Sequence, residues 1–295
     1  YPASYPEAVT VAATNAKDER SLFSNYGYSS DLAAPGEAIL STVLDNRYDS
    51  ASGTSMAAPH VAGAAALVWS LHPGLGNRDV EDILRNATDP IASTDYVGSG
   101  RLNLHRALAF EVPLARARLE VPAQFQGRMD VMGTAAGDRF ERYVVEYGDG
   151  TYPAEWTRLF ESDQPVAGGA LIRDFRTDRV PEGAHVLRLR VRDRLGQEVI
   201  ERTNIVVRNV TLSAPAHNDV IRWGERVEIR GTVFGSGRTY RIEHGQGLSP
   251  QSWSSAGIEL ANGGQLEVMG GRLATWDTGV AAPDLTSVIP SGPPT

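Results

Sequence analysis

The sequence contains no cysteine among its 295 residues. Disulfides and thiolate metal sites are therefore excluded, although the compartment of the protein stays open. Lysine is nearly absent too, since Lys17 is the only one and the other basic residues are arginines. The formal net charge is -8 at pH 7. This balance argues against nucleic acid or an anionic membrane as the main partner, because both attract clustered Lys and Arg.

Long hydrophobic runs are also missing. The nearest candidate, residues 57–71, is shorter than the roughly 18–20 residues that cross a bilayer, and His60 interrupts it. We therefore expect no membrane span. The sequence opens at Tyr1 without Met or a signal peptide, and it ends with the Pro-rich residues 291–295. We expect the chain to be a fragment of a longer protein.

Hydrophobic residues make up 41% of the chain and charged residues 22%, which is typical of a folded protein of two or three domains. Residues 1–109 predict an α/β fold with a partial parallel sheet. Residues 8–13 and 38–43 are short apolar runs bounded by turn residues, and we interpret them as buried strands. Residues 55–72 are apolar on every face, which predicts a buried central helix with Pro59 in its first turn. Two shorter helices are expected, one at 78–86 with Asn77 as its cap and one ending near Ala109.

After Phe110 the pattern changes to alternating strands and Gly/Pro turns. Residues 184–192 place Leu187, Leu189 and Val191 on one face and three arginines on the other, which predicts a half-buried antiparallel strand. A turn at 193–196 leads into a second alternating run. The arginine face, formed by Arg188, Arg190 and Arg192, is interpreted as a solvated strand face.

This region also contains an internal repeat. The spacing Gly148-x-Gly150-x-x-Pro153-x-x-Trp156 recurs at Gly245-x-Gly247-x-x-Pro250-x-x-Trp253, and a Gly-Thr pair recurs at residues 133–134 and 231–232. We therefore expect two all-β sandwich modules, at 110–209 and 210–295, of immunoglobulin or fibronectin III type, the second of them truncated. Each repeated Trp could be a platform on which a ligand stacks, but such a Trp is more often a core residue.

The segment Gly53–Gly63 carries the chemistry. A serine in the first turn of a helix, here Ser55, lies where free N–H groups converge at the positive end of the helix dipole. Its own amide can donate to an oxyanion that forms on an attacked carbonyl. Gly53 would let a substrate backbone approach closely, and Gly63 would let the helix pack tightly. Because Ala57 replaces the second glycine, this is not the Gly-x-Ser-x-Gly turn of α/β-hydrolases.

Gly53–Gly63 resembles the nucleophile signature of the subtilases, a family of serine proteases. The resemblance extends to Tyr1–Ala13, Phe23–Gly27 with Asp31–Gly36, and Tyr96–Asn103, so it covers residues 1–109. It implies an incomplete subtilisin-like domain. The family's catalytic Asp and His and its oxyanion Asn precede the matched segment in family order, and the missing strands are expected to leave one face of the 55–72 helix uncovered.

The resemblance implies a role for individual residues. Ser55 would be the nucleophile, with its amide as half of the oxyanion hole. Thr54 and Gly53 would line the substrate, and Tyr1 and Pro2 would be remnants of a specificity-pocket wall. Because the family's histidine lies upstream, we interpret His60 as a packed helix residue and not as the general base.

The family also implies a weak calcium site. The carbonyls of Ala3 and Tyr5 would contribute, together with a carboxylate at a position that reads Asn15 here. The missing carboxylate weakens this expectation, and no cofactor is required for the chemistry. By the same resemblance we expect extracellular localisation.

Three functional hypotheses stay open. The parent protein could be a secreted serine endopeptidase that acts on proteins or peptides, in which case this chain needs the N-terminal half of its catalytic domain. It could instead be a pseudoprotease with a degenerate triad, or a surface-binding scaffold that acts through the β modules. The intact Gly53-Thr54-Ser55 favours the endopeptidase. Without its base, Ser55 Oγ is an ordinary alcohol, so we expect the chain alone to be inactive.

Overall fold

The computed structural model describes residues 3, 5, 8–27, 29–91, 96–112, 114–237, 239–265 and 267–280. Of the described residues, 43% lie in strands and 15% in helices. It divides into two compact units. The first contains residues 1–121, 130–173 and 184–204, and the second contains residues 122–129, 174–183 and 205–295.

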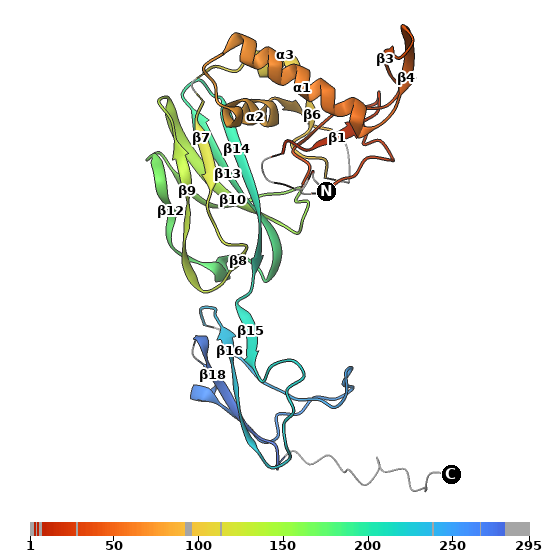
Figure 1. Ribbon diagram of the computed structural model, residues 1–295. Coiled ribbons are helices and arrows are strands. Elements are labelled where there is room, and N and C mark those ends of the chain that lie inside the picture. Colours follow the sequence, from red (N-terminus) through yellow and green to blue (C-terminus); the bar gives the residue numbers. More distant parts are fainter. Residues whose placement is uncertain are drawn as a thin grey trace, which may run out of the picture. The chain divides into compact units, whose positions relative to one another are not determined.

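The first unit begins with a small, partly parallel sheet (Figure 1). Its strands are short and rich in alanine, which leaves room for a helix to pack closely on them. β1 and β2 run parallel, with Ala13 opposite Ala34, and β2 is also parallel to β6. The strand order is β1-β2-β6-β5, where the strands are β1 (Val11–Thr14), β2 (Leu32–Pro35), β5 (Thr88–Asp89) and β6 (Arg101–Leu102).

Helix α1 (Thr54–Leu71) packs on this sheet through one stripe of small side chains. The stripe repeats at helical spacing and consists of Ala57, Val61, Ala64 and Val68. The other faces are exposed, including Leu67, Trp69 and Leu71 at 46%, 39% and 56%. The prediction of a helix buried on every side is therefore wrong for the described structure. The expectation of one uncovered face is confirmed.

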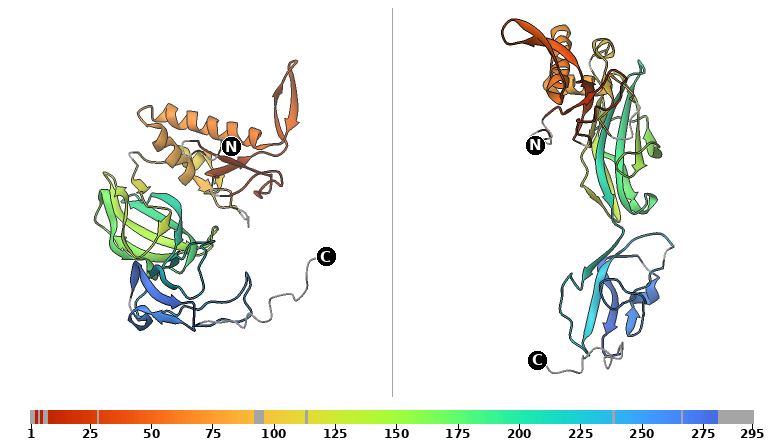
Figure 2. Two further views of the ribbon diagram at one scale, coloured as in Figure 1. Left: turned by 60° about the horizontal axis from the view of Figure 1, so that its bottom comes forward. Right: turned by 90° about the vertical axis from the view of Figure 1, so that its right-hand side faces the viewer.

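Residues 38–43 form an exposed hairpin and not the predicted buried strand. β3 (Ile39–Val43) pairs with β4 (Arg47–Ala51), and nine of the ten residues in the two strands are exposed. Three residues, 44–46, connect the two strands, and two of them, Asp45 and Asn46, have positive φ. The hairpin projects away from α1 in each view (Figures 1 and 2).

The two shorter helices lie close to their predicted positions. α2 (Asn77–Asn86) is capped by Gly76, whose amide donates to Asp79, so the prediction of Asn77 as the cap is wrong by one residue. Asp79 lies in the first turn of α2, where a negative charge is stabilised by the positive end of the helix dipole. α3 (Leu104–Leu108) ends where the sequence predicted.

Two sheets follow the helices, with strand orders β11-β10-β13-β14-β8 and β12-β9-β7. The predicted strand at 184–192 is confirmed within β13, where Leu187, Leu189 and Val191 are fully buried. The strands are β7 (Arg116–Leu119), β8 (Gln124–Phe125), β9 (Arg128–Ala136), β10 (Phe140–Asp149), β11 (Thr157–Ser162), β12 (Val166–Arg176), β13 (Gly183–Asp193) and β14 (Glu198–Val207). A 3-10 turn, η1 (Thr177–Arg179), follows β12.

The last sheet lies in the second unit and has the order β15-β16-β18-β17. Its core is small, with Ile229, Leu273 and Ala274 buried. Tyr240 supports this core by donating its hydroxyl to the carbonyl of Leu273 at 2.8 Å. The strands are β15 (Val210–Ala214), β16 (Arg226–Val233), β17 (Ile258–Leu260) and β18 (Val268–Asp277), with a 3-10 turn η2 (Ala261–Gly264).

The repeated glycines have matching surroundings. A Cβ on Gly133 would lie 2.2 Å from the Arg118 carbonyl oxygen, and one on Gly231 would lie 2.0 Å from the carbonyl oxygen of Thr211. In both cases a leucine side chain fills the other side. Gly148 likewise lies against Pro153, as Gly245 lies against Pro250. The two copies of the repeat therefore use the same local packing.

Charged side chains join α2 to the first β region within the first unit. Asp82 is only 8% exposed, and both of its oxygens accept from Arg118, at 2.8 and 3.3 Å. Nearby, Arg85 faces Glu201 at 3.8 Å. Because a buried carboxylate needs its partner, this contact fixes how α2 meets the β region.

We predict that Arg118→Ala destabilises the protein by about 2–3 kcal/mol, because it leaves the Asp82 carboxylate buried and unpaired. Urea unfolding followed by circular dichroism measures this loss. The control is Arg47→Ala, because Arg47 and Asp45 form an exposed pair that contributes at most about 0.5 kcal/mol. Equal effects of the two substitutions would contradict the prediction.

A second prediction concerns pH. Burial raises the pKa of Glu201 above its ordinary 4.5, so the folded protein holds this proton more tightly than the unfolded chain. The stability from this group is present below pH 4.5 and is lost as pH rises through the raised pKa. Glu201→Gln should therefore gain stability relative to wild type between pH 4.5 and 7. Urea midpoints across this range measure the difference, and parallel pH curves would refute the prediction.

Candidate active site

The candidate nucleophile lies at the start of α1. Ser55 is in the first turn and is exposed, as is Thr54. Gly53 precedes the helix, and its carbonyl accepts from the amides of Met56 and Ala57 at 3.0 and 3.3 Å. Amides in a first helical turn have no acceptor within the helix, and the dipole makes this end positive. The amide of Ser55 is therefore placed to donate to a substrate carbonyl oxygen, and its hydroxyl is exposed beside it.

Gly36 holds this helix start against the sheet. Its carbonyl accepts from the amide of Gly53 at 2.7 Å. A Cβ at position 36 would lie 2.6 Å from Cβ of Ala13 and 2.8 Å from the Gly53 carbonyl oxygen. No side chain fits there, so only glycine lets the chain leave β2 so close to the start of α1. The sequence analysis assigned no role to Gly36. The Pro35-Gly36 pair directly after an apolar strand could have indicated that the backbone makes a close approach there.

His60 is not arranged as a base for Ser55. Its Nδ1 lies 2.8 Å from the carbonyl oxygen of Met56, one turn earlier in the same helix. Five residues separate it from Ser55, which places the two on different faces of α1. The expectation that His60 is packed is wrong, because its side chain is exposed, although it lies next to the buried stripe on α1.

Gly63 also differs from its expected role. A Cβ added there would meet nothing within 4 Å, so the glycine is not needed for close packing in the described structure. It lies on the uncovered side of α1, away from the sheet.

The residues of the expected calcium site already take part in hydrogen bonds. Both lone pairs of Asn15 Oδ1 are used, since it accepts from the amides of Lys17 and Glu19 at 2.9 and 3.1 Å. The carbonyl of Ala3 accepts from a threonine hydroxyl, and that of Tyr5 from a backbone amide. In the part of the chain that the structure describes, no three His, Asp or Glu residues gather as metal ligands. Tyr1 and Pro2, the expected pocket remnants, lie outside the described residues.

We predict opposite effects for two glycine substitutions. Gly36→Ala should destabilise the protein by about 1–3 kcal/mol, because its Cβ overlaps Ala13 and the start of α1. Gly63→Ala should stabilise it by up to about 1 kcal/mol, because alanine favours the helix and meets no neighbour. Chemical unfolding of both variants measures the two effects. A neutral Gly36→Ala would show that α1 does not need this close approach.

The segment that contains Ser55 is similar to known proteins. The family model described as "Subtilase family" matches residues 1–108. Subtilisin from Bacillus pumilus is 44% identical over 107 residues, which are 36% of this chain and 39% of that protein. Subtilisin E from Bacillus subtilis is 43% identical over the same length, which is 28% of that protein.

A solved structure of a cold-adapted subtilisin-like serine proteinase is 42% identical, with a TM-score of 0.33, and the match covers 35% of this chain and 38% of that one. The chain thus spans less than half the length of the relatives that it matches. The match contains the helix start that carries Ser55, and residues 1–108 are similar to the subtilase family.

Proposed function

We propose that the chain is part of a subtilisin-like serine endopeptidase that hydrolyses peptide bonds of proteins, with Ser55 as its nucleophile. The observation that carries this proposal is the exposed Ser55 in the first turn of α1, within a segment 44% identical to subtilisin. Ser55 Oγ attacks the substrate carbonyl, and its amide donates to the oxyanion that forms. Gly53 and Thr54 flank the bound substrate.

The reaction needs a base that this sequence does not supply. When Oγ attacks, its proton passes to a histidine, and His60 is bonded to its own helix instead. In subtilisin itself, loss of the histidine alone lowers turnover about as much as loss of the whole triad, by about 10⁶-fold. We therefore propose that the chain is inactive until the N-terminal half of the catalytic domain joins it.

The proposal also covers the cofactor requirement, the location and the domain organisation of the protein. The reaction requires no cofactor, and the relatives favour an extracellular location. Residues 110–209 and 210–295 are proposed as two β-sandwich modules, the second incomplete, and the matching surroundings of Gly133 and Gly231 support this assignment. Among the described residues, no helix is long and apolar enough to cross a bilayer.

We predict that the chain alone does not cleave casein above the background of its Ser55→Ala variant. A chimera tests the nucleophile itself. It joins the upstream part of Bacillus pumilus subtilisin, with its Asp, His and Asn, to residues 1–109 of this chain. The chimera should cleave casein, and Ser55→Ala should lower the rate by about 10⁶-fold.

Circular dichroism of both chimeras controls for folding. A folded chimera whose activity survives Ser55→Ala would exclude Ser55 as the nucleophile. Ser55-dependent cleavage by the chain without its upstream half would refute the proposed inactivity.

A further inference from the structure

The first unit contains a cavity of about 560 Å³. Residues 96–100, before β6, form one side of it, and residues 151–154 with Trp156, in the loop before β11, form another. Val186 of β13 and Arg202 of β14 also line it. Cavities of about 300–1,000 Å³ are typical of sites that hold small ligands. The cavity is therefore large enough for a ligand of that class.

The sides of the cavity are fixed by contacts that the fold makes by itself. The carbonyl of Tyr96 accepts from the amide of Gly27 at 2.7 Å. On the other side Gly148 packs on Pro153, where a Cβ on the glycine would lie 2.2 Å from Cβ of the proline. The rings of Tyr96 and Tyr152 stack across the two sides, with centres 5.7 Å apart. A ligand that enters therefore needs to order little of the chain.

Trp156, which lines the cavity, is covered on one face by an arginine. The guanidinium of Arg188, from β13, lies 3.8 Å from the centre of its ring and 2.6 Å from Glu146. The side chains of Arg188 and Glu146 are only 13% and 10% exposed. Contrary to the sequence interpretation, Arg188 is therefore clamped between a Trp and a Glu and is not simply solvated, and Trp156 is half-buried beneath it.

Arg202 adds a positive charge that the chain does not balance. It is partly buried on β14, the neighbour of β13 in the sheet. In the described part of the chain its guanidinium forms no ion pair and no hydrogen bond. Burial lowers the pKa of Arg188, and the nearby charge of Arg202 lowers it further, against the opposing effect of Glu146. An anion bound beside Arg202 would therefore relieve the repulsion between the two guanidiniums.

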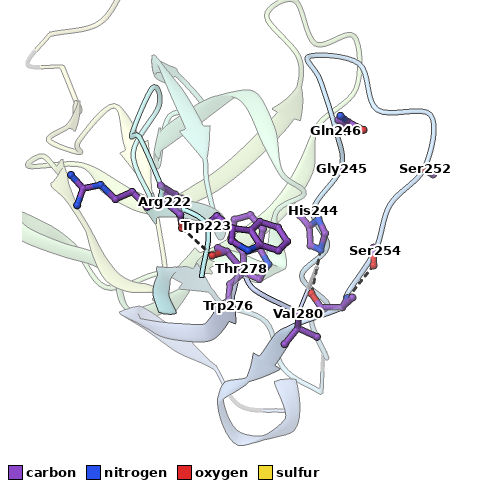
Figure 3. Close-up of a pocket in the computed structure, with 12 residues that line it drawn as sticks. Arg222, Trp223, His244, Gly245, Gln246, Ser252, Ser254, Trp276, Thr278 and Val280 are labelled. Atoms are coloured by element: carbon purple, nitrogen blue, oxygen red, sulfur yellow. Dashed lines mark hydrogen bonds between the residues drawn. The ribbon is translucent and has the colours of Figure 1, made fainter. Parts of the chain in front are cut away.

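A second cavity, of about 600 Å³ in the second unit, also has aromatic rings but differs in its charge (Figure 3). There His244 stacks on Trp276 with ring centres 5.0 Å apart, and the guanidinium of Arg222 points away from both rings. Trp253, which corresponds to Trp156 in the repeat, lines neither cavity and is 60% exposed, so its prediction as a core residue is wrong. The two cavities therefore differ in whether a partly buried cation accompanies the rings.

We propose that the cavity of the first unit binds a ligand that carries an aromatic ring and a carboxylate. The carboxylate pairs with Arg202, because the planar guanidinium matches its two oxygens. The ring packs on Tyr152, which is 43% exposed and so has ring surface open to a ligand. One unpaired guanidinium balances one negative charge, which favours a carboxylate over the roughly −1.5 to −2 charge of a phosphate monoester. This site is independent of Ser55.

Calorimetric titration of the full chain with phenylpropionate and with the neutral phenylpropionamide tests the inference. The acid should bind about tenfold more tightly than the amide, because only the acid pairs with Arg202, and tenfold corresponds to about 1.4 kcal/mol. Arg202→Met should abolish this preference, since it removes the cation and keeps an apolar stem. Tyr152→Ala should weaken both probes about fivefold through the loss of ring packing.

Two matched controls lie outside the cavity. Arg222→Met removes an arginine that borders the cavity of the second unit, and Trp253→Ala removes an exposed aromatic ring. Neither substitution should change the binding of the acid or the amide. Circular dichroism of all four variants controls for folding, and the comparison of acid with amide on the wild type needs no variant.

Equal binding of the acid and the amide to the wild type would overturn the pairing with Arg202, as would tighter binding of phenyl phosphate than of the acid. Weakening by Arg222→Met instead of Arg202→Met would place the ligand in the second unit and contradict the proposal. Absence of binding by both probes would refute the site. Acetyl-Ala-Ala-Phe with a free carboxylate separates two sources of the same chemistry. Tighter binding of this peptide than of phenylpropionate assigns the site to a peptide end, and weaker binding assigns it to a free acid.

Discussion

The structure around the candidate nucleophile depends on the absence of a side chain at Gly36. Its backbone fills the space between β1 and the start of α1, where a Cβ would overlap Ala13 and the carbonyl of Gly53. The hydrogen bond from the Gly53 amide to the Gly36 carbonyl then sets where the helix begins. Because Ser55 lies in the first turn of this helix, the position of its amide and hydroxyl follows from this close approach.

The subtilase segment and the first β region share one compact unit, and buried charge explains the specificity of their contact. Asp82 and Arg118 are bonded through two pairs of atoms, and Arg85 lies near Glu201. The buried carboxylate of Asp82 is satisfied only where Arg118 can reach it, so this pair favours one position of α2 on the β region. The α2 surface is therefore held in register even though α1 has a largely exposed outer side.

The two copies of the β repeat show how equal local sequence leads to different surroundings. Gly148 and Gly245 each pack on a proline, since that contact is made within the loop. Trp156 and Trp253 differ, because the arginine that covers Trp156 comes from β13, far along the chain. A Trp at a fixed spacing therefore does not reveal whether its side chain is covered or exposed.

The sequence by itself determined the features that depend on local pattern. It predicted the helix at 55–72 and the buried face of β13, and it located the repeat. These succeed because periodicity and turn residues act over a few neighbouring positions. Tertiary structure alone decided the exposure of β3, of His60 and of Trp253, and the need for glycine at position 36. Each of these depends on which distant segment lies against the residue. Local patterns in a single sequence do not show which distant segments come into contact.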